Sequence, residues 1–279
     1  KKIINKKYYN KKNLSTISDH VPIHKKPLND NDFGYYLAGL IEGDGSINKI
    51  NPYISICFYE LDTPLAYYIK KKIGYGTILK IKNKRAINYH LRHKDGIIRL
   101  IDLINGKLRT NKIIDWNTYI IHKINEKYDK TYFKYNIDNS NLKNNYWLAG
   151  FTDSDGSFQI KTIKRNNKKN NYEIRLSYQI DQKTDHILNQ IKELFSGYLG
   201  FRSKLNTYYF QTVSFSSAYK VIKYLDNYHL LSSKYLNYLK WRKTYLYIQK
   251  REHLTLKGIK KIIKIKKTMN SYSNDKFEL

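Results

Sequence analysis

The clearest pattern in the chain is the alternation of apolar and polar side chains over residues 172–181. One set of alternate positions is apolar, and the set between them is polar or charged. Strict alternation predicts a strand with one buried face. Residues 53–59 alternate in the same way after the turn signal Asn51-Pro52. The buried sides are Ile54, Ile56 and Phe58 in the earlier strand, and Ile174, Leu176, Tyr178 and Ile180 in the later one.

Most of the remaining chain shows either less regular alternation of apolar and polar residues, which predicts strands, or helical periodicity. A polar loop, Asn166–Asn171, joins two of the strands, and Gly74 and Ser196-Gly197 end two of the helices. We predict strands at residues 77–82, 86–93, 157–165, 198–204 and 207–215. We predict helices at residues 63–73, 95–105, 112–126, 185–195, 218–227, 232–249 and 254–268.

A twelve-residue stretch, Tyr36–Ile47, returns 111 residues later as Trp147–Phe158. Each copy reads as a short apolar helix, for which Asn31 or Asp32 is the predicted cap in the first copy. Small residues four apart allow two such helices to approach closely, and each copy is the natural partner of the other. Gly45 and Gly156 stand where helices often end in a left-handed residue.

Each copy ends with an aspartate immediately before that glycine, Asp44 and Asp155. A carboxylate is unfavourable at the negative end of a helix dipole, and two of them side by side call for a cation. Mg²⁺ prefers oxygen ligands and often uses one or two carboxylates with substrate phosphates. The repeat therefore predicts a metal site between two pseudo-symmetric halves.

The charge of the chain indicates an anionic partner. There are 52 Lys and Arg against 23 Asp and Glu, a formal charge of +29, and 15% of the residues are aromatic. This balance is typical of nucleic-acid-binding proteins, with an anionic membrane surface as the competing partner. A single cysteine excludes an internal disulfide and a multi-cysteine zinc finger, and no apolar run of about 20 residues predicts a membrane span.

The repeats Leu37–Gly45 (LAGLIEGDG) and Leu148–Gly156 (LAGFTDSDG) resemble the two motifs of single-chain LAGLIDADG homing endonucleases. The resemblance covers residues 31–249. It implies an α+β fold of two pseudo-symmetric αββαββα halves, with saddle-shaped antiparallel sheets on DNA and the motif helices packed together. We accordingly divide the chain into a basic N-terminal tail (1–30), a first half (31–126), a linker (127–141), a second half (142–250) and a basic C-terminal helix and tail (251–279).

The resemblance also implies which residues act. Asp44 and Asp155 would be the catalytic acids and, with Gly43 and Ser154, the metal ligands. A basic residue in each half matches Lys112 and Lys234, and a polar residue after the second strand matches Gln182. The corresponding place in the first half is occupied by Leu61, which departs from the pattern. The implied cofactor is Mg²⁺, for which Ca²⁺ or Mn²⁺ can substitute in binding.

The polar faces of the predicted strands offer side chains suited to base edges and phosphates. In the first half these are Tyr53, Ser55, Lys80, Lys82, Asn88, His90 and Arg92. In the second half they are Gln159, Lys161, Arg165, Arg175, Ser177, Gln179, Arg202, Lys204 and Gln211.

The predicted function is site-specific hydrolysis of both strands of a long DNA target by a monomer that binds no membrane. An RNA maturase that binds intron RNA on the same scaffold, and a DNA-binding protein without catalysis, are the alternatives. GIY-YIG chemistry is represented only by the isolated Gly74-Tyr75-Gly76, and the clustered histidines of an HNH site are missing. Lys, Asn, Ile and Tyr have A/T-rich codons and, with the resemblance, indicate a mitochondrial gene.

Overall fold

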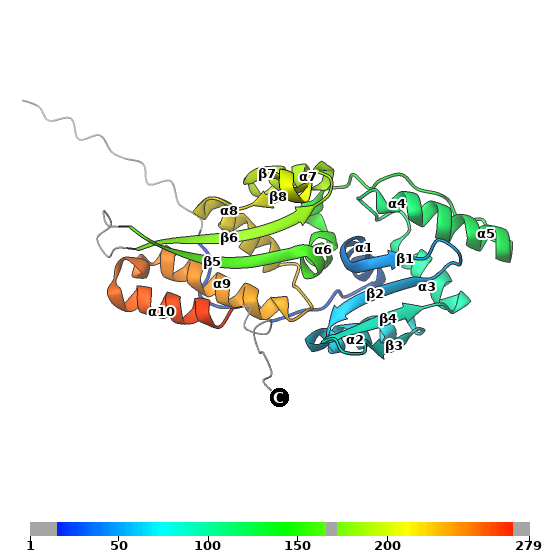
Figure 1. Cartoon of the computed structure of the whole chain (residues 1–279), viewed down its shortest axis with the longest axis horizontal. Coiled ribbons are helices and arrows are strands. Elements are labelled where there is room, and N and C mark those ends of the chain that lie inside the picture. The colour runs from blue at the N-terminus through cyan, green and yellow to red at the C-terminus, as the bar shows by residue number, and fades with distance from the viewer. Residues whose placement is uncertain (1–15, 166–171, 270–279) are drawn as a thin grey trace, which may run out of the picture.

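The computed structural model describes residues 16–165 and 172–269, so the loop predicted at Asn166–Asn171 lies outside the described residues. Two halves with the same order of elements lie side by side along the long axis of the molecule (Figure 1). The predicted α+β fold with two pseudo-symmetric halves is confirmed. The first half consists of α1 (Asp30–Asp44), β1 (Gly45–Ile47), β2 (Ile54–Tyr59), η1 (Glu60–Asp62), α2 (Thr63–Ile73), β3 (Thr77–Lys80), β4 (Ala86–Leu91), α3 (Lys94–Ile104), α4 (Lys112–Asp115), the π-helical η2 (Trp116–Ile121) and α5 (His122–Tyr128).

The second half begins after an extended connection and a short turn of helix. Its own elements repeat the order of the first half and add one helix at the end. They are η3 (Leu142–Asn144), α6 (Trp147–Asp155), β5 (Gly156–Lys164), β6 (Tyr172–Gln182), α7 (His186–Phe195), β7 (Tyr198–Arg202), η4 (Ser203–Leu205), β8 (Thr207–Gln211), α8 (Phe215–Leu225), α9 (Lys234–Gln249), η5 (Glu252–Leu254) and α10 (Leu256–Lys267).

Each half contains one antiparallel sheet, with strand orders β1-β2-β4-β3 and β5-β6-β8-β7. The registers are equivalent, because Gly45 pairs with Ile56 and Gly156 pairs with Ile180. The alternation predicted for β2 and β6 is confirmed, since Ile56 and Ile180 are buried while their polar neighbours lie on the opposite face. The helices cover the apolar face of each sheet, which leaves the polar face open.

The two motif helices α1 and α6 lie against each other at the middle of the molecule (Figure 1). The prediction that each copy of the repeat is the partner of the other is therefore confirmed. The prediction of left-handed glycines was wrong: Gly45 and Gly156 have φ of −77° and −75° and begin strands. Glycine is needed there for space, because a Cβ on Gly45 would lie 2.6 Å from the carbonyl oxygen of Ile41.

Several predicted boundaries differ from the observed ones, most clearly at the start of α1 and at the end of β8. The cap of α1 is Asn29 rather than Asn31 or Asp32, and its side chain accepts a hydrogen bond from the backbone N–H of Asp32 at 2.8 Å. The last strand ends at Gln211, and α8 begins at Phe215, because Ser214 forms a capping box there. The residues beyond the last strand thus belong to a helix start.

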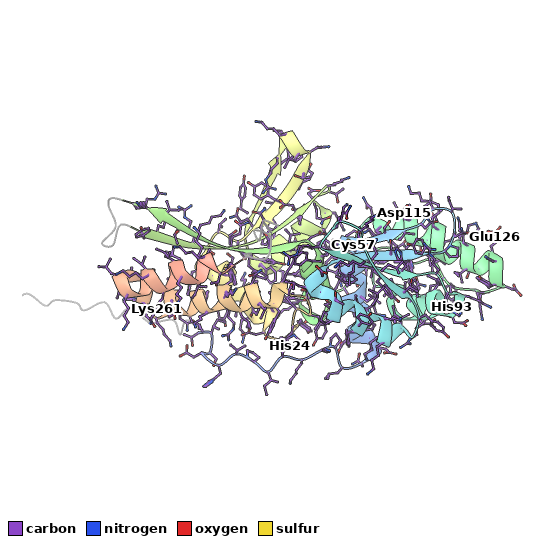
Figure 2. The ribbon with its side chains drawn as sticks, turned by 60° about the horizontal axis from the view of Figure 1, so that its bottom comes forward. His24, Cys57, His93, Asp115, Glu126 and Lys261 are labelled. Carbon is purple, nitrogen blue, oxygen red and sulfur yellow. The ribbon has the colours of Figure 1, made fainter. Side chains whose placement is uncertain are left out.

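Residues 16–29, the described part of the segment predicted as a basic N-terminal tail, pack on the body of the protein. Residues 16–29 run along the outside of α9, and Figure 2 labels His24 on this segment. Ile17 is buried and exchanges two hydrogen bonds of 2.9 Å with the side chain of Gln249. Arg242 donates to the carbonyl oxygens of Ser18 and His20 at 3.0 and 3.2 Å. The first half is therefore tied to the second through this segment.

The basic C-terminal helix α10 packs on the body of the protein. Ile259 and Ile262 are buried against α9 and β5, and the Nζ atom of Lys266 donates to Thr162 at 3.0 Å. The lysines Lys257, Lys260, Lys264 and Lys267 remain exposed. Within residues 16–165 and 172–269, no helix has both the length and the apolar character that a membrane crossing requires.

Candidate active site

The crossing of α1 and α6 brings the two helix ends together. A Cβ on Gly39 would lie 2.0 Å from the carbonyl oxygen of Trp147, and one on Gly150 would lie 1.9 Å from that of Tyr36. Only glycine permits backbones to approach this closely. Further along, Gly43 faces Ser154, whose Oγ would lie 1.8 Å from a Cβ at that position. The helices therefore remain in contact up to their last residues.

Asp44 and Asp155 are the last residues of these helices. The Oδ2 atom of Asp155 would lie 3.0 Å from a Cβ on Gly43, so this carboxylate reaches across to the other helix. Burial, followed by repulsion from Asp155, raises the pKa of Asp44 to about 6. Burial also raises the pKa of Asp155, against the lowering effects of Lys234 and Gln182. The structure thus brings together the two carboxylates that the sequence singled out.

Two lysines reach the same helix ends. Lys112 Nζ donates to the carbonyl oxygens of Ile41 at 2.9 Å, Gly45 at 2.6 Å and Gly43 at 3.5 Å. Positive charge at a helix C-terminus is favourable, and it offsets the carboxylate at the same end. Burial lowers the pKa of the Lys112 ammonium group, while the nearby carboxylates raise it.

Lys234 has the equivalent place in the second half. Its Nζ donates to the carbonyl oxygens of Ser154 and Thr152, the latter at 3.3 Å. Burial lowers the pKa of this lysine too, with Asp153 as the largest opposing effect. One aspartate carboxylate and one lysine ammonium group therefore lie at the C-terminal end of each motif helix, where the resemblance placed them.

The polar residue Gln182 breaks the symmetry. Its Nε2 donates to Asp155 Oδ2 at 2.7 Å. In the second half Gln182 pairs with Tyr208, and at the equivalent place in the first half Phe58 pairs with Ile87. The counterpart of Gln182 is therefore Phe58 and not Leu61. The assignment of Leu61 as the counterpart was wrong, since the first hairpin is shorter. Phe58 is 4% exposed and has no hydrogen-bonding side chain.

Two buried carboxylates were not assigned a role from the sequence. Glu42 and Asp153 lie two residues before Asp44 and Asp155, and each is 5% exposed. Glu42 accepts hydrogen bonds from the loop before Lys112, and Asp153 accepts them from the loop before Lys234. The signal was present, because both copies of the repeat carry an acid at this position.

The open faces of the two sheets carry most of the predicted DNA-binding residues. Cross-strand pairing places Ser55 beside His90, and Gln159 beside Ser177. Cys57, labelled in Figure 2, lies on the same face beside Asn88 and is exposed. On the open face of the second sheet, Lys161 also pairs with Arg175, and Gln179 pairs with Gln211.

Some predicted contacts are placed differently. Lys80 pairs with Ile87 on the helix-covered face and forms a 2.7 Å ion pair with Glu60. Ser177 lies on the open face but is only 1% exposed, and its hydroxyl is buried without a hydrogen-bond partner. These two positions correct the sequence prediction, which counted both among the accessible residues of the open faces.

The remaining predicted contacts lie at the margins of the sheets. Tyr53, just before β2, hydrogen-bonds His90, and the guanidinium of Arg92 lies 4.6 Å from the centre of the Tyr53 ring. Arg165 and Arg175 both pair with Glu173, and Arg202 pairs with Asp181. Lys82 lies in the turn after β3 and Lys204 lies in η4.

Among the described residues, no group of three or more His, Cys, Asp and Glu side chains could hold a metal ion. A cation here would therefore depend on the two aspartates, backbone oxygens and a bound phosphate. This donor set consists of oxygens alone, as hard divalent cations prefer.

Comparisons with known proteins agree with this geometry. The profile of the LAGLIDADG endonuclease family matches residues 148–245. A Schizosaccharomyces pombe protein described as an uncharacterized cox1 intron-2 37.2 kDa protein is 50% identical over 89% of this chain and 76% of its own length. The Saccharomyces cerevisiae intron-encoded DNA endonuclease aI3 is 30% identical over 87% of this chain and 70% of its own length.

Two further similarities bear on fold and function. The intron-encoded RNA maturase bI4 of Saccharomyces cerevisiae is 30% identical over 63% of this chain but only 26% of its own length. The solved structure of I-SmaMI, bound to an uncleaved DNA target in the presence of calcium ions, has a TM-score of 0.66 and 24% identity. The structural alignment covers 85% of this chain and 98% of the I-SmaMI chain.

Proposed function

This chain belongs to the LAGLIDADG endonuclease family, and we propose that it is a site-specific endonuclease that hydrolyses both strands of a long, asymmetric DNA target. The observation that carries this proposal is the pair of carboxylates at the touching ends of α1 and α6. Asp44 and Asp155 each have a lysine at the same helix end, Lys112 and Lys234. One such set for each DNA strand is the arrangement that a double-strand break requires.

A divalent cation fits this site. Burial and mutual repulsion raise the pKa of Asp44, and a bound cation relieves both effects. Asp44 and Asp155 would hold it together with the carbonyl oxygens of Gly43 and Ser154. Each of these carbonyls already accepts a lysine hydrogen bond, and its second lone pair remains for another partner. We propose Mg²⁺, with Ca²⁺ or Mn²⁺ able to replace it in binding.

When bound, the cation supplies Lewis-acid polarisation of the phosphate and a more acidic water. The protein's own residues contribute position and charge. Lys112 and Lys234 hold fixed positive charge beside the place where the scissile phosphates would gain negative charge. Gln182 holds the Asp155 carboxylate in one orientation through the 2.7 Å hydrogen bond.

The open faces of the two sheets would read the DNA. A two-stranded β-ribbon fits the major groove, and β5 with β6 forms the longest ribbon within residues 16–165 and 172–269. The net charge of +29 would attract phosphates strongly. Because phosphate contacts release counterions, we expect affinity to fall steeply as salt is added. We propose that the protein acts as a monomer, since both acids come from one chain.

An RNA maturase remains the second candidate, favoured by the similarity to bI4. Binding to intron RNA would need the positive charge but not the paired acids. The cox1-intron relative and the A/T-rich codons of the common residues support a mitochondrial gene under either function.

The test is a cleavage assay on a pooled library of A/T-rich organellar DNA, with Mg²⁺ and with Ca²⁺. We expect discrete double-strand breaks at one long site with Mg²⁺ and binding without breaks with Ca²⁺. Asp44→Asn and Asp155→Asn should lose cleavage and keep binding, whereas the exposed and distant Glu126→Gln (Figure 2) should behave as the wild type. Binding without cleavage under every metal would reject the nuclease, and intron RNA would then be the ligand to test.

A further inference from the structure

Glu42 is buried at the end of α1 and is surrounded by hydrogen-bond donors. Its oxygens accept from the backbone N–H of Arg109 at 2.8 and 2.9 Å, and from the N–H and hydroxyl of Thr110 at 2.5 and 2.7 Å. Arg109 and Thr110 form the loop that leads directly into Lys112. This carboxylate therefore fixes the backbone from which Lys112 extends.

Asp153 does the same in the second half. It accepts from the backbone N–H groups of Leu231 at 2.7 Å and Ser232 at 3.3 Å, and from the Ser232 hydroxyl. These residues lead directly into Lys234. The two buried carboxylates thus have equivalent partners, although their side chains differ in length.

The last donor to each carboxylate comes from the opposite half. The indole Nε1 of Trp147, at the start of α6, donates to Glu42 Oε2 at 2.7 Å. The hydroxyl of Tyr36, in α1, donates to Asp153 Oδ2 at 2.7 Å. Tyr36 and Trp147 occupy the same place in the two copies of the repeat, immediately before Leu-Ala-Gly. All four side chains are buried, so no water competes for these hydrogen bonds.

We propose that Tyr36 and Trp147 are positioning residues that act across the two halves: Trp147 places Lys112 through Glu42, and Tyr36 places Lys234 through Asp153. The proposal deepens the proposed function, on which its catalytic consequence rests. Each lysine is then held correctly only while the two halves are docked. Docking of the motif helices and assembly of both sets of catalytic groups become one event.

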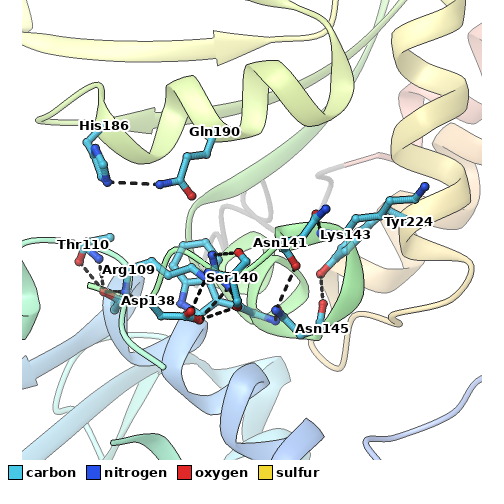
Figure 3. A network of polar contacts seen from close by, with 12 residues as sticks. Arg109, Thr110, Asp138, Ser140, Asn141, Lys143, Asn145, His186, Gln190 and Tyr224 are labelled. Carbon is cyan, nitrogen blue, oxygen red and sulfur yellow. Dashed lines mark hydrogen bonds and ion pairs between the residues drawn. The ribbon is translucent and has the colours of Figure 1, made fainter. Parts of the chain in front are cut away.

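Each lysine loop also has a second restraint, so the loss of one donor should loosen it without releasing it. The Arg109 guanidinium is anchored on the connection between the halves, with a 2.8 Å ion pair to Asp138 and two 2.6 Å hydrogen bonds to Ser140 (Figure 3). In the loop of the second half, the N–H of Ser233 donates to Asp62 of the first half at 2.6 Å. Because one hydrogen bond to a charged group is lost while the second restraint remains, we expect effects of about tenfold.

The first measurement needs no DNA. Lysines of the free protein are acetylated at limiting reagent, and the rate at each is read by mass spectrometry. Trp147→Phe should raise the rate at Lys112 about tenfold and leave Lys234 unchanged, and Tyr36→Phe should do the reverse. A rise at both lysines, at neither, or at the lysine in the same half as the substitution would overturn the proposal.

Matched controls separate this effect from a general loosening of the core. Trp116→Phe removes a buried indole hydrogen bond to Asn105 in the half that contains Lys112. Tyr89→Phe removes a buried hydroxyl hydrogen bond to the Tyr75 carbonyl. Both should leave the two lysine rates unchanged. If either control raised them as much as Trp147→Phe and Tyr36→Phe do, the crossed hydrogen bonds would not be the cause.

The second measurement follows cleavage of each strand separately, on a duplex that carries the site found in the library assay. Lys112→Met and Lys234→Met define which strand depends on which lysine. Trp147→Phe should then slow the strand that depends on Lys112, and Tyr36→Phe the strand that depends on Lys234. Equal slowing of both strands would reject the catalytic part of the proposal. A wild-type protein that cuts no DNA would reject the nuclease instead, and the acetylation result would stand.

Discussion

Removing the Asp44 charge should stabilise the protein in the absence of metal, by an amount that grows with pH. The folded protein holds the pKa of this carboxyl at about 6, above its ordinary value of 3.8. Between these two values the folded protein binds a proton that the unfolded chain has released, so stability falls as the pH rises. Above pH about 6 the penalty is complete. Asp44→Asn has no such penalty at any pH.

The size of the pKa shift of Asp44 determines how much Asp44→Asn should stabilise the protein. About two pKa units correspond to at most about 3 kcal/mol. The Asp44 side chain is only partly withdrawn from solvent at the helix end, so screening reduces this, and we expect about 1 kcal/mol. For a chain of this size that is a rise of about 2 °C in Tm.

The assay is thermal unfolding of the wild type and Asp44→Asn in EDTA, at a series of pH values from about 4 to 8. The difference in Tm should widen as the pH rises to about 6 and then stay constant. Glu126→Gln, far from the site, should show no such widening. Added Mg²⁺ should stabilise the wild type more than the variant, because it binds the folded state through the missing carboxylate. A Tm difference that is independent of pH would refute the raised pKa of Asp44, and with it the reasoning from burial and repulsion.

Three further predictions follow from other parts of the structure. Gly39→Ala places a Cβ 2.0 Å from the carbonyl oxygen of Trp147 and should lower the free energy of unfolding by about 3 kcal/mol or more in denaturant titrations; an unchanged midpoint would contradict the close packing. Arg242→Lys cannot keep both its ion pair with Asp226 and its hydrogen bonds to residues 18 and 20, so trypsin should cleave the segment 16–29 several-fold faster than in the wild type. An unchanged digestion rate would show that Arg242 does not hold the segment. Bound target DNA should slow maleimide labelling of Cys57, the single cysteine, about tenfold relative to the free protein, if the open sheet face binds DNA; equal rates would place the DNA elsewhere.

Local patterns in the sequence predicted most of the secondary structure. The helix Thr63–Ile73 was predicted to the residue, because Gly74 adopts a left-handed conformation immediately after it, with φ of +87°. The strand that contains Leu176 and Tyr178 was predicted from alternation alone. Such elements depend on neighbours in the sequence, and their signals are therefore visible there.

Features that depend on distant residues were not predictable in this way. Residues 16–29 have no apolar periodicity, and their order comes from contacts with residues more than 200 positions away. Lys80 was assigned to the open face because the adjacent apolar residues Ile78 and Leu79 do not reveal which of them faces the core; the observed pairing of Leu79 with Asn88 and of Lys80 with Ile87 places Lys80 on the helix-covered face. In a strand, a shift of one residue moves every side chain to the opposite face.

The candidate site shows how a repeat helps and where it misleads. Asp44 and Asp155 could be paired by counting, because the motif helices have no insertion between them. The counterpart of Gln182 could not, because the two hairpins differ in length and only the strand register reveals Phe58. The buried acids Glu42 and Asp153 were visible as repeated letters, but their role required knowing that α1 and α6 cross.

The crossing of α1 and α6 explains why the motif occurs twice, because each copy supplies groups that the other needs. A carboxylate at the C-terminal end of a helix is unfavourable, and in each copy a lysine of the same half offsets its charge. The lysine is held by a buried acid, and that acid is completed by an aromatic donor from the other copy. Neither half can satisfy all of these groups by itself, and an unpaired buried carboxylate would be costly. The duplicated arrangement therefore satisfies its buried groups only as a pair, which is also the form that the proposed cleavage of two DNA strands by one chain requires.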